Sequence, residues 1–303
     1  MHKLALLLPL ALLSSCAMPG IPGMPSRGGS GHISSSGDIV MPMRLRADAP
    51  HISGSINGSR ALPILVDTGA SVCVFESNIA AGTGIAATGH NASLRGVHGN
   101  AAARSGVIRA LDFGPWHLDN VPCYVRHSAT PRIGGLGSAI LGIDQLRRHA
   151  SYVTFDYRRG TIELGRGHSY TPLGGNTTRV PFRMSGGLPV IRVSSSGLTW
   201  DAVIDTGSSW GIVINQATAA RLGHAGGGRG MGAGLVLSGV GGNVSADRAG
   251  ARIIRVPNAS LCGQTYYNPE VYVMPGPMRI GSRFWQNYRM TLDFRTSTLW
   301  LER

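Results

Sequence analysis

The tripeptide Asp-Thr-Gly occurs twice in this chain of 303 residues, at 67–69 and at 205–207, and each copy follows an apolar run. Two carboxyl groups held at hydrogen-bonding distance cannot both ionise, so they share one proton. The ionised group can take a proton from water, while the protonated group gives one to the carbonyl that the water attacks. Asp67 and Asp205 therefore predict hydrolysis of an amide bond by general acid–base catalysis.

The residues that follow each aspartate suit such a site. Gly69 and Gly207 have no Cβ, so they let the two backbones approach each other and donate N–H groups to the carboxylates. Thr68 and Thr206 can hydrogen-bond across an axis between the two loops and hold them rigidly. We predict that these four residues support the two catalytic aspartates.

The two triplets differ in the next residue, which is Ala70 in the first copy and Ser208 in the second. A serine hydroxyl can donate to Asp205 and favour its charged form, whereas Asp67 lacks that donor. We therefore predict that Asp205 is more often ionised and that Asp67 more often carries the proton, although the two carboxyls titrate as a pair.

The sequence around the triplets is itself repeated, at an offset of about 139 residues. MPMRL at 41–45 matches VPFRM at 180–184, LRGVHGN at 94–100 matches LSGVGGN at 237–243, and VTFDYRRGTIEL at 153–164 matches MTLDFRTSTLWL at 290–301. We predict a duplicated and fused domain, with a first lobe at 38–165, a linker at 166–178 and a second lobe at 179–303.

Composition and patterning indicate how these lobes are built. The chain has 44 Gly and 17 Pro, only 14% charged residues, and many short Val, Ile and Leu runs between turn residues. Residues 51–69 read as two strands joined by an Asn-Gly turn. Brief helical stretches fit 78–84, 144–150, 216–223 and 282–288. We predict an all-β, bilobal fold of two homologous antiparallel lobes with short helices.

These motifs resemble those of the aspartic proteases, and specifically two retropepsin-type domains fused in tandem, as in a bilobal pepsin-like enzyme. The resemblance covers about residues 39–303. It rests on DTGA at 67–70, DTGS at 205–208, the glycine-containing segments at 94–100 and 237–243, ILG at 140–142, RIG at 279–281, and the closing strands around Asp156 and Asp293. It implies the pepsin-like acid protease fold and an aspartic endopeptidase that acts on polypeptides without a cofactor.

In that family a glycine-rich hairpin is a flap that closes over the peptide. The resemblance implies two flaps here, formed by Gly96, Val97, His98 and Gly99 and by Gly239, Val240, Gly241 and Gly242. His98 either contacts substrate or is a solvent-facing turn residue. The chain departs from the family at Arg279, where an apolar residue is preferred before Ile-Gly.

The N-terminus reads as an export signal. Residues 1–15 have a short basic start and an apolar run too short to span a bilayer comfortably, and LSSC at 13–16 resembles the lipobox of bacterial lipoproteins. The resemblance implies lipidation of Cys16 and, since Ala17 follows, an outer-membrane location facing the periplasm. The alternative is an ordinary signal peptide in which Cys16 is incidental. Residues 16–37 are rich in Pro, Gly and Ser and predict a flexible tether.

Three further cysteines follow in the sequence. Cys73 and Cys123 both lie in the first copy, and both are absent from the second. In the fold that the resemblance implies, their strands run near each other, so they form either a disulfide or two buried thiols. Cys262 is predicted to be a small buried hydrophobe.

Other classes of function find little support. The formal net charge is +13, but the arginines are scattered without a basic run, so we predict no nucleic-acid partner. The ten histidines show no tight metal-ligand spacing, so no metal site is predicted. The fused lobes make one site, which predicts a monomer. The alternative function is a catalytically silent, bilobal peptide-binding lipoprotein of the envelope.

Overall fold

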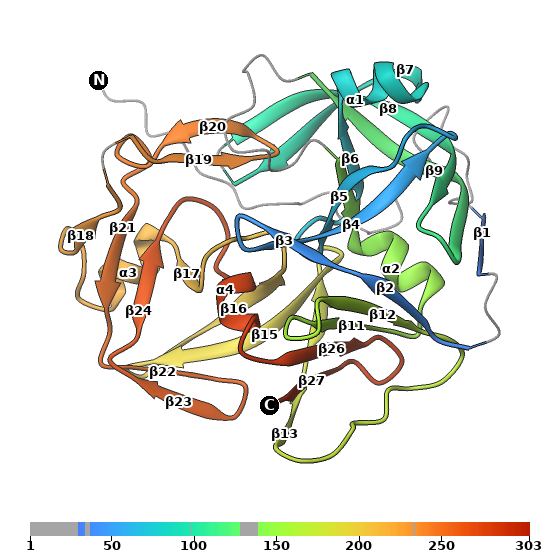
Figure 1. The fold of residues 1–303 in the computed structure, drawn as a ribbon. Coiled ribbons are helices and arrows are strands. Elements are labelled where there is room, and N and C mark those ends of the chain that lie inside the picture. The colour runs from blue at the N-terminus through green and yellow to red at the C-terminus, as the bar shows by residue number, and fades with distance from the viewer. Residues whose placement is uncertain (1–29, 34–36, 98, 128–138, 233) are drawn as a thin grey trace.

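The computed structural model describes residues 30–33, 37–97, 99–127, 139–232 and 234–303. Strands dominate this part of the chain, and its helices are short. The strands form two lobes, with a further sheet between and below them that is built from both halves of the chain (Figure 1). This is the all-β architecture of two lobes that the sequence predicts.

The first lobe is built around one large sheet. Its strands run in the order β1 (Ser30–Ile33), β9 (Trp116–Arg126), β6 (Cys73–Glu76), β10 (Ala139–Gly142), β5 (Leu62–Asp67), β4 (Ala49–Ile56), β8 (Gly99–Asp112) and β7 (Ala86–Gly96), and β3 (Arg44–Arg46) pairs with β4. The helices α1 (Ser77–Thr83) and α2 (Ile143–His149) follow β6 and β10.

The second lobe repeats this plan. Its strands run in the order β18 (Arg229–Gly230), β21 (Arg252–Arg255), β24 (Glu270–Val273), β17 (Ile212–Ile214), β25 (Arg279–Gly281), β16 (Leu198–Asp205), β15 (Leu188–Ser195), β22 (Asn258–Leu261) and β23 (Gln264–Tyr267), and β14 (Arg183–Ser185) pairs with β15. The helices α3 (Gln216–Arg221) and α4 (Ser282–Trp285) follow β17 and β25, and β19 (Val236–Gly239) and β20 (Gly242–Ser245) form a separate hairpin.

The strand that enters each triplet belongs to a hairpin whose turn the sequence specifies. Asn57 and Gly58 after β4 have φ of 51° and 75°, and Ser196 and Gly197 after β15 have φ of 47° and 78°. A type I′ turn requires these left-handed conformations at both central positions. The Asn-Gly turn is where the sequence predicts it, and the second copy uses Ser-Gly in its place.

The remaining sheet joins the two halves of the chain. Its order is β13 (Thr177–Pro181), β27 (Thr298–Glu302), β26 (Arg289–Asp293), β11 (Tyr152–Asp156), β12 (Thr161–Gly165) and β2 (Ile39–Pro42). β11 and β26 are the predicted closing strands of the two copies, and they pair antiparallel with Thr154 opposite Thr291. Their hydroxyl groups are 2.8 Å apart, so the two copies meet at equivalent residues.

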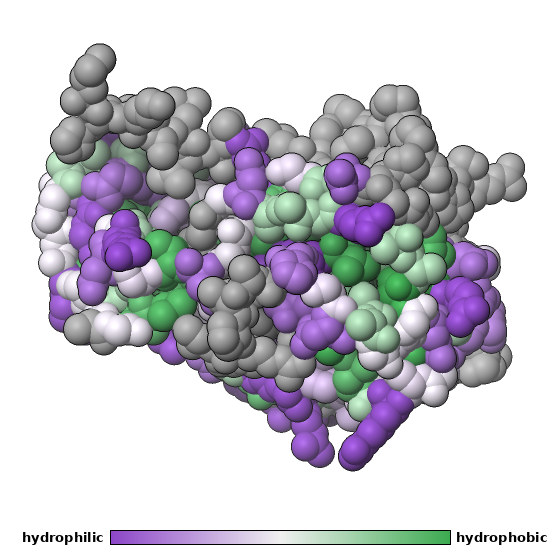
Figure 2. Space-filling model, turned by 90° about the horizontal axis from the view of Figure 1, so that it is seen from above, coloured by the Kyte–Doolittle hydropathy of each residue, from purple (hydrophilic) through white to green (hydrophobic). Residues whose placement is uncertain are grey.

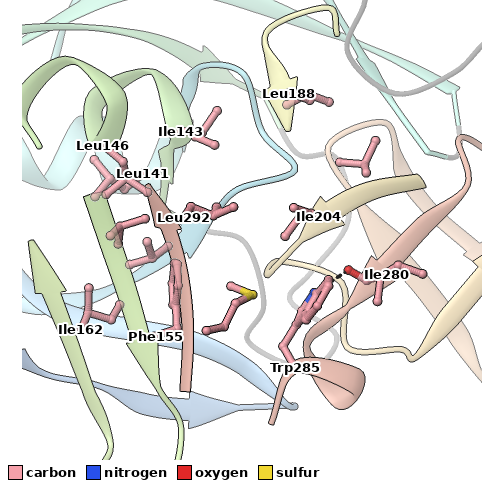
Figure 3. Close-up of a cluster of buried hydrophobic side chains, with 14 of the residues drawn as sticks. Leu141, Ile143, Leu146, Phe155, Ile162, Leu188, Ile204, Ile280, Trp285 and Leu292 are labelled. Carbon is pink, nitrogen blue, oxygen red and sulfur yellow. Dashed lines mark hydrogen bonds between the residues drawn. The ribbon is translucent and has the colours of Figure 1, made fainter. Parts of the chain in front are cut away.

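The apolar core is continuous across this junction. Figure 3 shows side chains of both copies converging: Leu141, Ile143, Leu146, Phe155 and Ile162 from the first, and Leu188, Ile204, Ile280, Trp285 and Leu292 from the second. Trp285 is fully buried and its indole N–H donates to the carbonyl of Ile280 at 2.8 Å. The strands that carry the triplets are therefore anchored in one shared core.

The described surface is mixed in character. Hydrophilic and apolar side chains are interspersed on the face seen from above (Figure 2). The large apolar side chains exposed in the described ranges are Val40, Leu45, Leu173 and Tyr267. Among the described residues, no helix is both long and apolar enough to cross a bilayer.

The structure changes the prediction for one N-terminal segment. Residues 30–33 lie inside the predicted tether, yet they form β1, which pairs antiparallel with β9 and places His32 opposite His117. The predicted signal peptide and Cys16 lie outside the described residues, as does His98 of the first predicted flap.

Candidate active site

The two aspartates stand at equivalent strand ends. Asp67 is the last residue of β5 and lies opposite Gly142 of the parallel strand β10. Asp205 is the last residue of β16 and lies opposite Gly281 of the parallel strand β25. The two lobes bring these ends together, so that each carboxyl group lies against the glycine of the opposite triplet and the two carboxyl groups interact.

The two threonines make a reciprocal set of hydrogen bonds across the lobe interface. Thr68 Oγ1 donates to the carbonyl of Ile204 at 2.6 Å, and Thr206 Oγ1 donates to the carbonyl of Val66 at 2.7 Å. Each hydroxyl also accepts from the backbone N–H of the other threonine at 3.0 Å. Both threonines are fully buried. These four bonds fix the two loops relative to each other, as the sequence predicts.

The two glycines are required by close approach. A Cβ on Gly69 would overlap the carboxyl group of Asp205, and a Cβ on Gly207 would overlap that of Asp67. The N–H of Gly69 donates to Oδ1 of Asp67 at 2.8 Å. Each glycine therefore leaves room for the carboxyl group of the opposite lobe.

Ser208 contacts the pair in a different way from the sequence prediction. Its backbone N–H donates to Oδ1 of Asp205 at 2.9 Å, while its hydroxyl accepts from Nε of Arg279 at 3.3 Å. In both copies the N–H at this position, from Ala70 or Ser208, also donates to the backbone carbonyl of its aspartate at 3.3 Å. The hydroxyl of Ser208 thus links Arg279 to the site.

Burial and charge make the pair asymmetric. Burial raises the pKa of Asp67 well above its ordinary value, and the neighbouring charge of Asp205 raises that pKa further. Burial also raises the pKa of Asp205, but the Arg279 guanidinium opposes the rise. These directions agree with the prediction that Asp67 carries the shared proton.

Sequence reasoning missed two supporting residues. Arg279 lies on β25, and its Nε is 3.7 Å from Oδ2 of Asp205. Ser282, the first residue of α4, donates its hydroxyl to the carbonyl of Thr206 at 2.7 Å. Arg279 was visible in the sequence as a departure from an apolar pattern, whereas Ser282 gave no signal because its role depends on where α4 begins.

Two hairpins occupy the predicted flap positions and meet near their tips (Figure 1). A Cβ on Gly96, at the end of β7, would overlap the backbone of Gly241 between β19 and β20. Val97 lies against Gly276 of the second lobe, and Val240 packs on a first-lobe cluster that includes Ile140. Each hairpin thus reaches across to the opposite lobe.

One arginine fastens the second hairpin to the first lobe. Nη1 of Arg126, at the end of β9, donates to the carbonyls of Gly239 and Val240 at 2.7 Å each. Its Nη2 donates to Oε1 of Glu76 at 2.7 Å, and both side chains are largely buried. The ion pair of Arg126 and Glu76 therefore fastens the tip of the β19–β20 hairpin to the first lobe.

The cysteines lie outside this set of contacts. Cys73 and Cys123 are in register on the parallel strands β6 and β9, and both are free, buried thiols, which is the second of the two predicted alternatives. Burial raises the pKa of Cys123 to about 12. Cys262 is also a buried free thiol, as predicted.

The sequence predicts no metal site, but β1 brings three donor side chains together. The ligand atoms of His32, His117 and Asp119 all lie within 4.8 Å of one another. His117 is already held between Asp112 and Asp119, and these carboxylates raise its pKa. The imidazole ring of His32 lies against that of His117, with the ring centroids 4.7 Å apart, so the group lies where β1 pairs with β9.

The comparisons with known proteins agree with this geometry. A family model described as aspartyl protease matches residues 52–144, which contain the first triplet. Among solved structures, the chain is similar to the crystal structure of aspartic proteinase from Irpex lacteus, with a TM-score of 0.53 and 13% sequence identity. That match covers 88% of this chain and 97% of the other. A comparison with curated proteins found no match. The fold is therefore bilobal and pepsin-like across both copies.

Proposed function

We propose that this protein is an aspartic endopeptidase whose catalytic pair is Asp67 and Asp205. The observation that supports the proposal is that these two carboxyl groups interact and come from equivalent strand ends of two lobes with the same strand plan. The reciprocal bonds of Thr68 and Thr206 hold the two loops in fixed register. A preorganised pair of this kind is what general acid–base hydrolysis requires.

The asymmetry of the pair assigns the roles. Asp205 is the ionised member, and it takes a proton from a water molecule held between the two carboxyl groups. Asp67 is the protonated member, and it donates its proton to the carbonyl oxygen as the water attacks the carbonyl carbon. When the C–N bond breaks, the leaving nitrogen takes the proton that Asp205 received, and Asp67 takes a proton from one hydroxyl of the tetrahedral intermediate as the carbonyl reforms, which restores the starting state of the pair. Neither step needs a covalent intermediate.

The substrate that we propose is a polypeptide in extended form, covered by the two hairpins at 96–99 and 239–242. We further propose that the protein acts in the bacterial cell envelope, held at the outer membrane through a lipid on Cys16 and facing the periplasm. One chain supplies both aspartates, so a monomer is sufficient for the site. The silent peptide-binding lipoprotein is the alternative that the experiment must separate.

The test is cleavage of unfolded casein by the full chain in detergent, from pH 3 to pH 8, beside Asp67→Asn and Asp205→Asn. We expect cleavage by the wild-type protein, inhibition by a statine-type inhibitor, and loss of at least about a thousandfold in each variant. Thr199→Val, a change on the exposed face of β16, is the matched control. A folded wild-type protein that binds casein without cutting it would overturn the proposal in favour of a binding module.

A further inference from the structure

Arg279 is a buried cation beside the catalytic pair. It begins β25, where Arg279 pairs with Val203 just as Ile140 pairs with Leu65 in the first copy. Ile140 is an apolar core residue, whereas Arg279 places a guanidinium in the interior and is only 3% exposed. Burial of a charge is costly unless it is paired and hydrogen-bonded, so its partners indicate its role.

The partners of Arg279 lie on both sides of the guanidinium. Towards the site, Nε is 3.7 Å from Oδ2 of Asp205 and donates to Oγ of Ser208 at 3.3 Å. On the far side, Nη1 donates to the carbonyls of Pro277 at 3.0 Å and Pro275 at 3.4 Å. The segment before β25 therefore holds the cation in place, and Asp205 is the carboxylate that it faces.

We infer that Arg279 is a positioning residue that keeps the negative charge of the pair on Asp205 and sets the pH range in which the pair holds one proton. This inference rests on the proposed function. The first copy has Ile140 at the matching position, so the pseudo-symmetry of the lobes is broken at this point.

The other groups that face Asp205 do not replace this cation. Asp67 is the partner that shares its proton. Tyr157, from the loop after β11, contacts Ser282 through its hydroxyl at 3.3 Å, and burial raises its pKa, so it stays neutral. Ser208 and Thr206 offer neutral donors and acceptors. Among these groups, Arg279 is the one that carries positive charge.

The sign of the effect follows from the charge. A fixed cation favours every form of the pair that carries negative charge, so it lowers both apparent pKa values. The singly protonated form is the active one. Replacing Arg279 with a neutral residue therefore moves both limbs of the pH–rate profile to higher pH. An opposite charge at this range shifts the pKa of an aspartate by about 1 to 3 units.

The experiment compares Arg279→Met and Arg279→Lys with the wild-type full chain, using Arg192→Met on the exposed face of β15 as the control. Two readouts are taken: kcat/KM for a peptide against pH, and the titration of ¹³C-labelled aspartate carboxyls by NMR. We expect Arg279→Met to raise both apparent pKa values by about 1 to 3 units. Arg279→Lys should lie close to the wild type, and Arg192→Met should leave both values unchanged.

A second measurement needs no change at Arg279. In Asp67→Asn the remaining carboxyl is Asp205, and in Asp205→Asn it is Asp67. We expect Asp205 alone to titrate at lower pH than Asp67 alone. Equal or reversed values, or a folded Arg279→Met protein that loses rate with both limbs unmoved, would overturn the inference. A shifted NMR titration without any peptide cleavage would support the role of Arg279 and reject the protease.

Discussion

At the scale of single residues, the site depends on the absence of two Cβ atoms. Gly69 and Gly207 each lie against the carboxyl group of the opposite lobe, and a methyl group at either position needs the space that the carboxyl occupies. Misplacing a catalytic group by about 1 Å costs about a hundredfold in rate. Because the hydrogen bonds of Thr68 and Thr206 fix both loops, the carboxyl groups cannot shift easily to make room for a methyl group.

We therefore expect Gly207→Ala to lower kcat/KM by at least about a hundredfold and to destabilise the protein by about 1 to 3 kcal/mol through overpacking. The measurements are peptide cleavage and urea unfolding. Gly226→Ala is the control, because a Cβ at Gly226 meets only open space. Wild-type activity in Gly207→Ala would show that the loops are more compliant than their contacts indicate.

The residues of the two triplets were predictable from the sequence, whereas the role of Arg279 was not. The aspartates, threonines and glycines were predictable because each has a local chemical reason for its type beside its neighbours. Arg279 stood out in the sequence only because it occupies a position before Ile-Gly where an apolar residue is preferred. Its contact with Asp205 depends on the path of residues 274–278, where the carbonyls of Pro275 and Pro277 accept from it, and no local pattern specifies that path.

At the scale of elements, the hairpin at β19–β20 is tied to the first lobe by a charged side chain. That hairpins lie at 86–112 and 236–245 agrees with the glycine-containing segments of the repeat, while their role as flaps stays a prediction. The attachment was not, because Arg126 and Glu76 are brought together by the parallel pairing of β6 with β9, 50 residues apart. Under the proposed function a peptide enters beneath this hairpin, and the bonds of Arg126 to Gly239 and Val240 would then oppose its opening.

We expect Arg126→Ala to speed amide hydrogen exchange in residues 236–245 by at least about tenfold, since each bond from a charged donor contributes about 1.5 to 3 kcal/mol. The measurement is hydrogen exchange by mass spectrometry on the full chain. Arg109→Ala, at an exposed position of β8, serves for comparison. Unchanged exchange in Arg126→Ala would mean that Val240 alone holds the hairpin.

The helix α2 carries a second element-scale consequence, which depends on pH. Burial raises the pKa of Asp144, in its first turn, to about 6. This folded-state pKa lies above the unfolded value. The contribution of the protonated Asp144 carboxyl to the free energy of unfolding is therefore fully present below about pH 4 and is lost as the pH rises through 6. Asn does not ionise, so the Asp144→Asn protein does not lose this contribution as the pH rises.

We therefore expect Asp144→Asn to gain about 2 to 3 kcal/mol relative to the wild type between pH 4 and pH 7, measured by urea unfolding at both values. Asp247→Asn at an exposed position is the control. Parallel pH dependence in the wild type and Asp144→Asn would show that this carboxyl does not titrate in the expected range.

At the scale of the whole molecule, the two copies are joined by the shared sheet and by one arginine across it. Arg289 of the second copy contacts Asp156 at 3.2 Å and Glu163 at 2.9 Å, both from the first copy, and also Glu302 at 3.7 Å. The shared strand plan of the two lobes and the closing strands were predictable from the repeat. Their direct pairing into one sheet was not, because the repeat does not say which strand edges meet.

We expect Arg289→Met to destabilise the protein by about 3 to 5 kcal/mol, because it leaves largely buried carboxylates without their cation. Urea unfolding gives the value. Arg255→Met, which breaks an exposed pair with Glu270, should cost less than about 1 kcal/mol. Equal effects of the two changes would mean that the ion pairs of Arg289 add little to the attachment of the two copies.

The pairing of β11 with β26 also has a consequence for biosynthesis. The two threonines at its centre are 137 residues apart, so a chain that emerges N-terminus first completes the first lobe long before β26 becomes available. During that interval β11 is an open edge, and open edges pair with other chains. Because the missing partner is a copy of the same strand, a second nascent first lobe is the natural competitor. The time that residues 157–289 take to emerge into the compartment where the chain folds therefore decides how long each first lobe is exposed to that misassembly.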